Sequence, residues 1–63
     1  INFIMIRNTT TSNEYEITGE CFFLQEEELF LGVSYVNEDL ETISVSFKVQ
    51  DDTFLNDNYE LIW

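Results

Sequence analysis

Several residue types that small proteins use for stability or chemistry are scarce in this sequence. The 63 residues include no histidine, no proline and one cysteine, Cys21. A single cysteine cannot form a disulfide within the chain, and there is no Cys/His set for a structural zinc. Without histidine, the Ser–His and Cys–His pairs of nucleophilic catalysis are excluded as well. We therefore expect stability to come from apolar burial.

Positive charge is equally scarce. Arg7 and Lys48 oppose thirteen acids, so the net charge is −11. Nucleic-acid-binding domains need a basic surface, so we expect no direct contact with DNA or RNA, and none with an anionic membrane. All thirteen acids lie within residues 14–63. Such a field attracts basic surfaces instead.

Long apolar runs and helical periodicity are the third absence. The apolar run at residues 21–24, like that at residues 3–6, is far too short to span a membrane. Alternation with a period of two residues dominates, which is typical of strands. Six Phe, three Tyr and one Trp exclude a disordered acidic tail. We expect one small domain over residues 1–63. Because the chain starts with Ile1, we also expect it to have been cropped or processed upstream.

The alternating runs predict an all-β fold. They cover residues 1–7, 14–25, 29–36, 42–50 and 58–63, with turn-like segments between them. We expect a five-stranded antiparallel meander, strongly twisted or curled into a half-open barrel, with a short helical turn near residues 51–58.

Strand registers can be chosen so that apolar residues face one another across every pair. The predicted pairs are Phe3/Ile17, Met5/Tyr15, Phe23/Leu31, Cys21/Val33, Tyr35/Ile43, Val33/Val45, Leu31/Phe47, Phe47/Leu61 and Val45/Trp63. This register points Met5 and Cys21 into the core. Gly19 is expected to permit a bend or bulge.

The opposite face of the predicted sheet carries an apolar cluster, Phe22, Leu24 and Phe30, beside acidic residues. A contiguous apolar patch rimmed by charge is typical of an interface. Acidic turns at residues 26–28 and 37–41 are either solvated loops or charge aimed at a basic partner. The candidate partner-binding residues are Glu14, Glu16, Glu20, Phe22, Leu24, Glu26, Glu27, Glu28, Phe30, Glu38, Asp39 and Glu41.

Catalysis and metal binding find no support among the acids. The loops at 37–41 and 51–57 lack the ligand spacing and central glycine of an EF-hand. Paired carboxylates need a cleft, and an interior filled by Phe and Leu leaves little room for one. We therefore expect no enzymatic activity, no metal site and no cofactor.

Carboxylates spaced along a sheet can imitate the phosphates of a nucleic acid. We expect an inhibitor that occupies a basic site on a nuclease or another nucleic-acid enzyme. In size and composition the chain resembles the short acidic inhibitors of phages and mobile elements, including anti-CRISPR and anti-restriction proteins. That resemblance implies the cytoplasm of a bacterial host. The alternatives are an immunity or antitoxin protein that neutralises a basic toxin, and a homodimeric or larger structural assembly domain whose acidity serves solubility.

Overall fold

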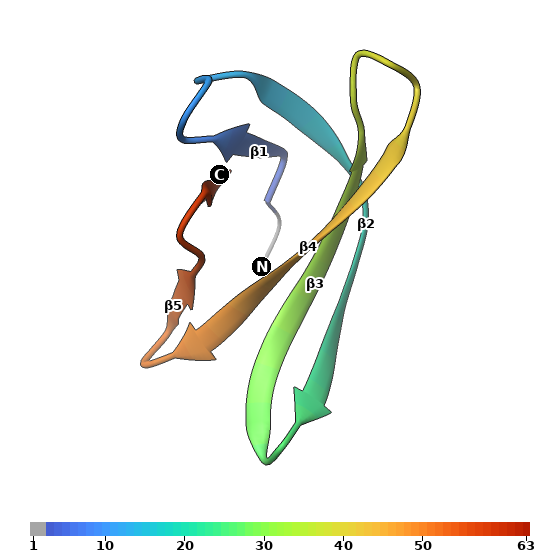
Figure 1. Cartoon of the computed structure of the whole chain (residues 1–63). Helices are drawn as coiled ribbons and strands as arrows, with labels where there is room; N and C mark the ends of the chain where they lie inside the picture. The colour runs from blue at the N-terminus through green and yellow to red at the C-terminus, as the bar shows by residue number, and fades with distance from the viewer. Residues whose placement is uncertain (1–2) are drawn as a thin grey trace.

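The computed structural model describes residues 3–63, which form one antiparallel sheet of six strands curled into a nearly closed barrel (Figure 1). The strands are β1 (Met5–Asn8), β2 (Glu14–Gln25), β3 (Glu28–Val36), β4 (Thr42–Gln50), β5 (Thr53–Leu55) and β6 (Tyr59–Ile62). Their order in the sheet is β5-β4-β3-β2-β1-β6. The predicted all-β class and half-open barrel are confirmed.

The segment between β4 and β6 differs from the prediction. A helical turn was expected near residues 51–58, but Asp51 and Asp52 form a hairpin turn with φ angles of 52° and 63°. Thr53 then pairs with Gln50, and β5 becomes a sixth strand. The prediction was wrong because two residues in the left-handed region reverse the chain instead of starting a helix.

The position of β6 beside β1 brings the barrel close to closure. We expected the last strand to lie beside β4, with Phe47 opposite Leu61, but β6 pairs with β1 and Leu61 faces Ile6. The pairing of Val45 with Trp63 fails for the same reason. The two ends of the chain thus join the sheet side by side, and β5 and β6 approach across the remaining gap. Residues 1 and 2 of the predicted first strand lie outside the described residues.

The β3–β4 register is confirmed, whereas the β1–β2 register is shifted by one residue. Leu31 faces Phe47, Val33 faces Val45 and Tyr35 faces Ile43, as predicted. On β1, Ile6 faces Tyr15, so Ile6 is fully buried and Met5 is not. A shift of one residue exchanges the two faces of a strand.

A bulge divides β2 into two parts. The β2–β3 register shifts between Ile17 and Gly19, close to the position expected for a glycine bulge. A Cβ on Gly19 would lie 3.1 Å from Ser34 Oγ, so a larger residue would crowd this close approach. One extra residue inverts the alternation beyond it.

This inversion overturns two predicted pairs. Cys21 faces Gly32 instead of Val33, and Phe23 faces Phe30 instead of Leu31. Cys21 is therefore an exposed free thiol.

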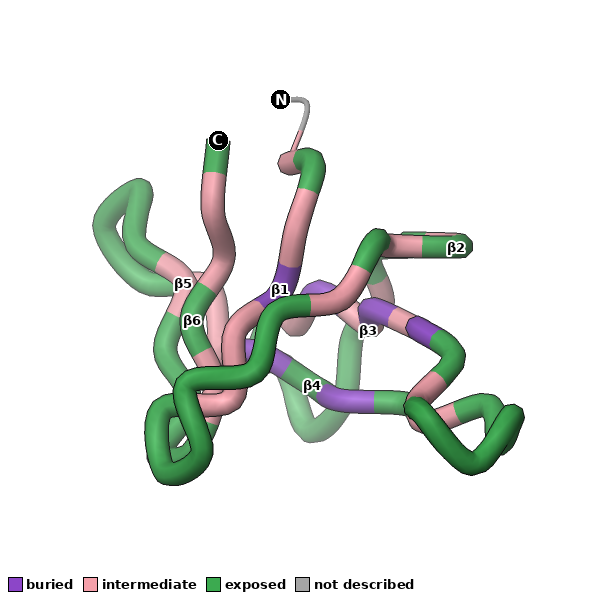
Figure 2. The backbone as a smooth tube through the Cα atoms, turned by 90° about the horizontal axis from the view of Figure 1, so that it is seen from above, coloured by how far each residue is buried: buried purple, intermediate pink, exposed green. Residues whose placement is uncertain are grey.

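The core lies inside the ring of strands and comes from β1, β3 and β4 (Figure 2). Its buried residues are Ile6, Leu31, Val33, Tyr35, Val45 and Phe47. Aromatic rings close one side of it: Tyr15 stacks on Tyr35 with ring centroids 4.5 Å apart. The buried Tyr35 hydroxyl shares a hydrogen bond of 2.9 Å with the Tyr59 hydroxyl, so no polar atom of the ring pair is left without a partner.

Because of Tyr35, the stability of the protein is expected to decrease at alkaline pH. Burial, and then the Tyr59 hydrogen bond, raise the pKa of the Tyr35 hydroxyl above its ordinary value of 10. The folded state thus holds this proton more tightly than the unfolded state, so the stabilisation is complete below pH 10 and is lost as pH rises above 10. We expect the unfolding free energy to fall by up to about 1.4 kcal/mol per pH unit there.

The measurement is urea unfolding at several pH values between neutral and strongly alkaline. Tyr35→Phe keeps the ring but not the proton, so its stability should fall less steeply above pH 10. Identical slopes for the two proteins would contradict the assignment to Tyr35.

Candidate functional site

The turn end of the β2–β3 hairpin projects beyond the rest of the barrel (Figure 1). Leu24 pairs with Leu29 and Gln25 with Glu28. Within the described residues, the β4 ladder on β3 starts only at Phe30, and β1 pairs with β2 only at Glu14–Glu16. The end of the hairpin is therefore held by its own two strands alone.

Two glutamates form the turn of this hairpin. Glu26 and Glu27 have φ angles of 51° and 66°, as in a type I′ turn, where both central residues have positive φ. Asn and Gly are the usual occupants, because a longer side chain in this region costs about 1 kcal/mol or more per residue. The turn predicted at 26–28 is thus a two-residue turn, and Glu28 is the first residue of β3.

One face of the projecting hairpin is apolar and exposed. Phe22, Leu24 and Leu29 are 56%, 74% and 39% exposed. Because of the bulge, Phe22 and Leu24 share a face with Leu31 and Leu29, and continue the core face beyond the filled interior. We call Glu20, Phe22, Leu24, Glu26, Glu27 and Leu29 the hairpin-tip surface.

At the base of the hairpin-tip surface, the apolar face of the hairpin meets the N-terminal segment. A small hollow of about 90 Å³ is lined by Phe3, Glu20, Phe22 and Leu31. Phe3 in turn packs edge-on against Phe54, with ring centroids 5.0 Å apart. The exposed Phe22 therefore lies next to packed aromatic residues, so an apolar group bound against Phe22 would be contiguous with the core.

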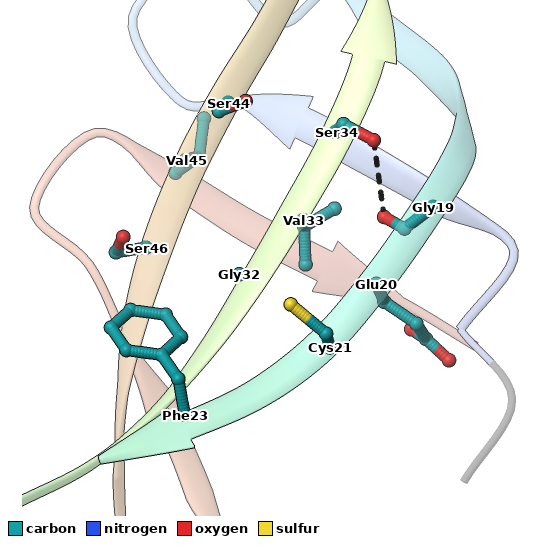
Figure 3. Close-up of a pocket in the computed structure, with 10 residues that line it drawn as sticks. All are labelled: Gly19, Glu20, Cys21, Phe23, Gly32, Val33, Ser34, Ser44, Val45 and Ser46. Carbon is teal, nitrogen blue, oxygen red and sulfur yellow. Dashed lines mark hydrogen bonds between the residues drawn. The ribbon is translucent and has the colours of Figure 1, made fainter.

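The outer face of the same hairpin is different. Phe23 stacks on Phe30, with ring centroids 5.5 Å apart, and beside them lies an open hollow of about 420 Å³ (Figure 3). The floor of this hollow is made of small residues, including Gly32 and Ser46, and the Cys21 side chain points across it. The expected cluster of Phe22, Leu24 and Phe30 is therefore wrong, because Phe30 lies on the opposite face.

The remaining candidate acids form two other groups. Glu14 accepts hydrogen bonds from Arg7, at 2.8 Å from Nη2, and Glu60 is the second ion-pair partner of Arg7. These side chains tie β2, β1 and β6 together on the outside of the barrel. Glu16 lies opposite Met5 in the same part of the sheet. Glu28 forms an ion pair of 3.6 Å with Lys48, so it is partly neutralised.

The loop at residues 37–41 is ordered and lies at the far end of β3 from the hairpin turn. The Asn37 side chain accepts hydrogen bonds from the backbone N–H groups of Asp39 and Glu41, both at 2.9 Å. Glu38 accepts a hydrogen bond of 2.7 Å from the Tyr15 hydroxyl, which raises the pKa of Tyr15. The structure thus does not bring Glu38, Asp39 and Glu41 together with Glu26 and Glu27.

Leu29 belongs to the surface, although the alternation of residues 29–36 places it on the same side of its strand as Leu31 and Val33, which were expected in the core. A signal for it was present in the sequence: Leu29 directly follows three glutamates and lies near the end of its strand. The adjacent strand was predicted to end at residue 50, so little of it remained to cover Leu29.

Residues 3–63 contain no group of three or more His, Cys, Asp or Glu side chains placed to hold a metal ion. No helix in this range is long and apolar enough to cross a membrane. No family model, curated protein or solved structure matches the chain.

The strained turn predicts a stabilising substitution. Replacing Glu26 by Asn and Glu27 by Gly supplies residues that accept positive φ, so the unfolding free energy should rise by about 1–2 kcal/mol. Chemical denaturation measures the change.

The control is Glu26→Gln with Glu27→Gln, which removes the same two charges and leaves the backbone preference unchanged. It should recover less of the gain than the Asn–Gly variant. A control that is as stable as Asn–Gly would show that charge repulsion, and not backbone strain, destabilises the turn.

Proposed function

We propose that the chain is a non-enzymatic inhibitor that binds a basic, nucleic-acid-binding site of a partner protein through the hairpin-tip surface. One observation carries the proposal: two exposed glutamates occupy left-handed positions at the end of a projecting hairpin. Stability alone does not account for them, since Asn–Gly would form the same turn with less strain. Backbone strain of this kind is concentrated at functional sites.

Charge supplies the attraction. With a net charge of −11, the chain has a field that steers basic proteins toward it and releases their counterions, as nucleic acid does. The molecule is 34 Å long in its largest dimension, which is about one turn of duplex DNA. The acids of the hairpin-tip surface lie at one end of that length, where they can oppose basic residues of a groove that binds nucleic acid.

Apolar side chains supply the residence time. Phe22, Leu24 and Leu29 are exposed next to Glu20, Glu26 and Glu27. Binding energy is usually concentrated in a few desolvated apolar anchors, whereas rim charges mainly speed association. A nuclease or another nucleic-acid enzyme in the cytoplasm of a bacterial host, as for anti-CRISPR or anti-restriction inhibitors of phages, fits these requirements.

The other candidates share part of this surface. An immunity or antitoxin protein would use the same acids and apolar anchors against a basic toxin, and the identity of the partner distinguishes it. A homodimeric assembly domain would use the apolar face alone. Two copies at −11 each repel one another, which disfavours the dimer.

The proposal is tested by capture from host lysate on the immobilised chain, with washes of increasing salt. We expect basic nucleic-acid enzymes to be retained at low salt, released by high salt and displaced by duplex DNA. The test variant is Glu26→Lys with Glu27→Lys, and the control is Asp51→Lys with Asp52→Lys, which changes the net charge equally at another turn with two acids at positive φ. Equal capture by the two variants, or retention of no such enzyme, would contradict the proposal.

Kinetics of the captured pair separate charge from apolar contact. We expect Glu26→Lys with Glu27→Lys to slow association, and Phe22→Ala to speed dissociation by about tenfold or more. Leu55→Ala serves as the control, because Leu55 is 49% exposed but lies on β5. Surface plasmon resonance gives both rates. A Phe22→Ala variant that dissociates at the same rate as Leu55→Ala would show that Phe22 is not part of the binding surface.

A further inference from the structure

Among the described residues, nothing pairs with one side of β2 for most of its length. The strand has twelve residues, and β1 pairs only with Glu14–Glu16. The N–H of Ile17 reaches the carbonyl oxygen of Ile4 at 3.5 Å. Beyond that point, no strand among residues 3–63 pairs with this side of β2. Residues 21–25 therefore have β3 on one side and a free edge on the other.

The turn geometry determines which main-chain groups face the free edge. In a two-residue hairpin the flanking pair, here Gln25 and Glu28, exchanges hydrogen bonds. Such pairs alternate with pairs that do not exchange them, so the N–H and C=O groups of Leu24 and Phe22 point away from β3. Unpaired strand edges of this kind are ready to accept another strand.

The usual protections against strand addition are weak along this edge. The chain has no proline, and its two cations lie on β1 and β4. The bulge precedes the open segment, at Ile17 to Gly19, instead of interrupting it. The edge residues Cys21, Phe22 and Leu24 are all exposed.

We propose that the free edge of β2 at residues 21–25 binds an extended, lysine- or arginine-flanked segment of the partner, which adds to the sheet as a further strand. This inference rests on the proposed function and specifies how the partner is held. Main-chain hydrogen bonds to Phe22 and Leu24 give affinity, as in other cases of strand addition. Alternate partner side chains lie on Phe22 and Leu24 on one face.

On the other face, the remaining side chains of the added strand lie on Cys21 and Phe23, which border the hollow of about 420 Å³ (Figure 3). The floor of that hollow is made of small residues, including Gly32 and Ser46, which leaves room for a side chain of the added strand. Both faces of an added strand therefore meet apolar or open surface.

Charge selects a basic segment over a second copy of this chain. Glu20 precedes the open edge and Glu26 and Glu27 follow it, so acids flank it at both ends. A segment with basic residues on either side of an apolar stretch complements this arrangement. A second copy would add its own acids to the same place.

The test uses a synthetic peptide, Lys-Lys-Val-Thr-Val-Thr-Val-Lys-Lys, and two N-methylated forms of equal charge. One form carries N-methyl groups on the valines and the other on the threonines. Because alternate N–H groups of a strand point to the same side, one form blocks pairing with β2 and the other leaves it free. We expect one form to bind at least about tenfold more weakly than the parent peptide and the other to match it.

Amide hydrogen exchange shows where the peptide binds. In the free protein, the amides of Phe22 and Leu24 should exchange faster than those of Cys21 and Phe23, and the parent peptide should slow them. On the protein side, Leu24→Pro removes an edge N–H without removing a bond to β3, and it should abolish binding. Leu24→Val keeps the N–H and should bind. If Leu24→Pro does not fold, the peptide pair decides the question alone.

Equal binding of both methylated peptides would overturn the inference, because charge alone would then explain the affinity. Failure of every peptide to bind, or protection of Phe22 and Leu24 by a dimer of the chain in the absence of peptide, would overturn it as well. Capture of a basic enzyme together with failed peptides would leave the proposed function standing without this edge. Peptide binding without any captured enzyme would support strand addition at the free edge and contradict the proposed inhibitor function.

Discussion

The bulge in β2 between Ile17 and Gly19 joins the part of the strand that belongs to the barrel to the part that forms the projecting hairpin. Before it, β2 pairs with both β1 and β3, and Tyr15 and Ile17 pack against the core. Beyond it, β2 has a neighbour on one side among the described residues, and its alternation is inverted. The bulge thus releases the strand from the barrel and turns Phe22 and Leu24 to the face that the core leaves uncovered.

The barrel that supports this hairpin is small. Six of residues 3–63 form its buried core, and a chain of this length has little stability to spare. Even so, both of its two-residue turns place acids in the left-handed region, Glu26 with Glu27 and Asp51 with Asp52. Aspartate accepts this conformation better than glutamate does, so the strain is greatest at the projecting hairpin, where we place the interaction with the partner.

The sequence predicted the parts of the fold that follow from alternation alone. The register of Leu31, Val33 and Tyr35 on β4 was correct because no residue is inserted between those strands. The faces of Cys21, Phe22 and Leu24 were wrong, because alternation does not show where an extra residue inverts it. The neighbour of β6 was wrong as well, since pairing between the two ends of the chain depends on closure of the barrel and leaves no local pattern.

The same limits apply to the candidate surface. Glu20, Phe22, Leu24, Glu26 and Glu27 were recognised from charge beside apolar residues, and they do lie together. Glu38, Asp39 and Glu41 were grouped with them by composition, yet β3 separates the two groups. Leu29 was missed because its exposure depends on how far β4 extends along β3.

The central claim is that the projecting hairpin is the part of the molecule that holds a partner. Hydrogen exchange of the chain in complex with the captured enzyme tests it most directly, because every amide reports separately. We expect the complex to protect Phe22, Leu24 and the turn at Glu26–Glu27, and to leave the loop at residues 37–41 unchanged. Protection confined to that loop, or to the outer strands β5 and β6, would contradict the account.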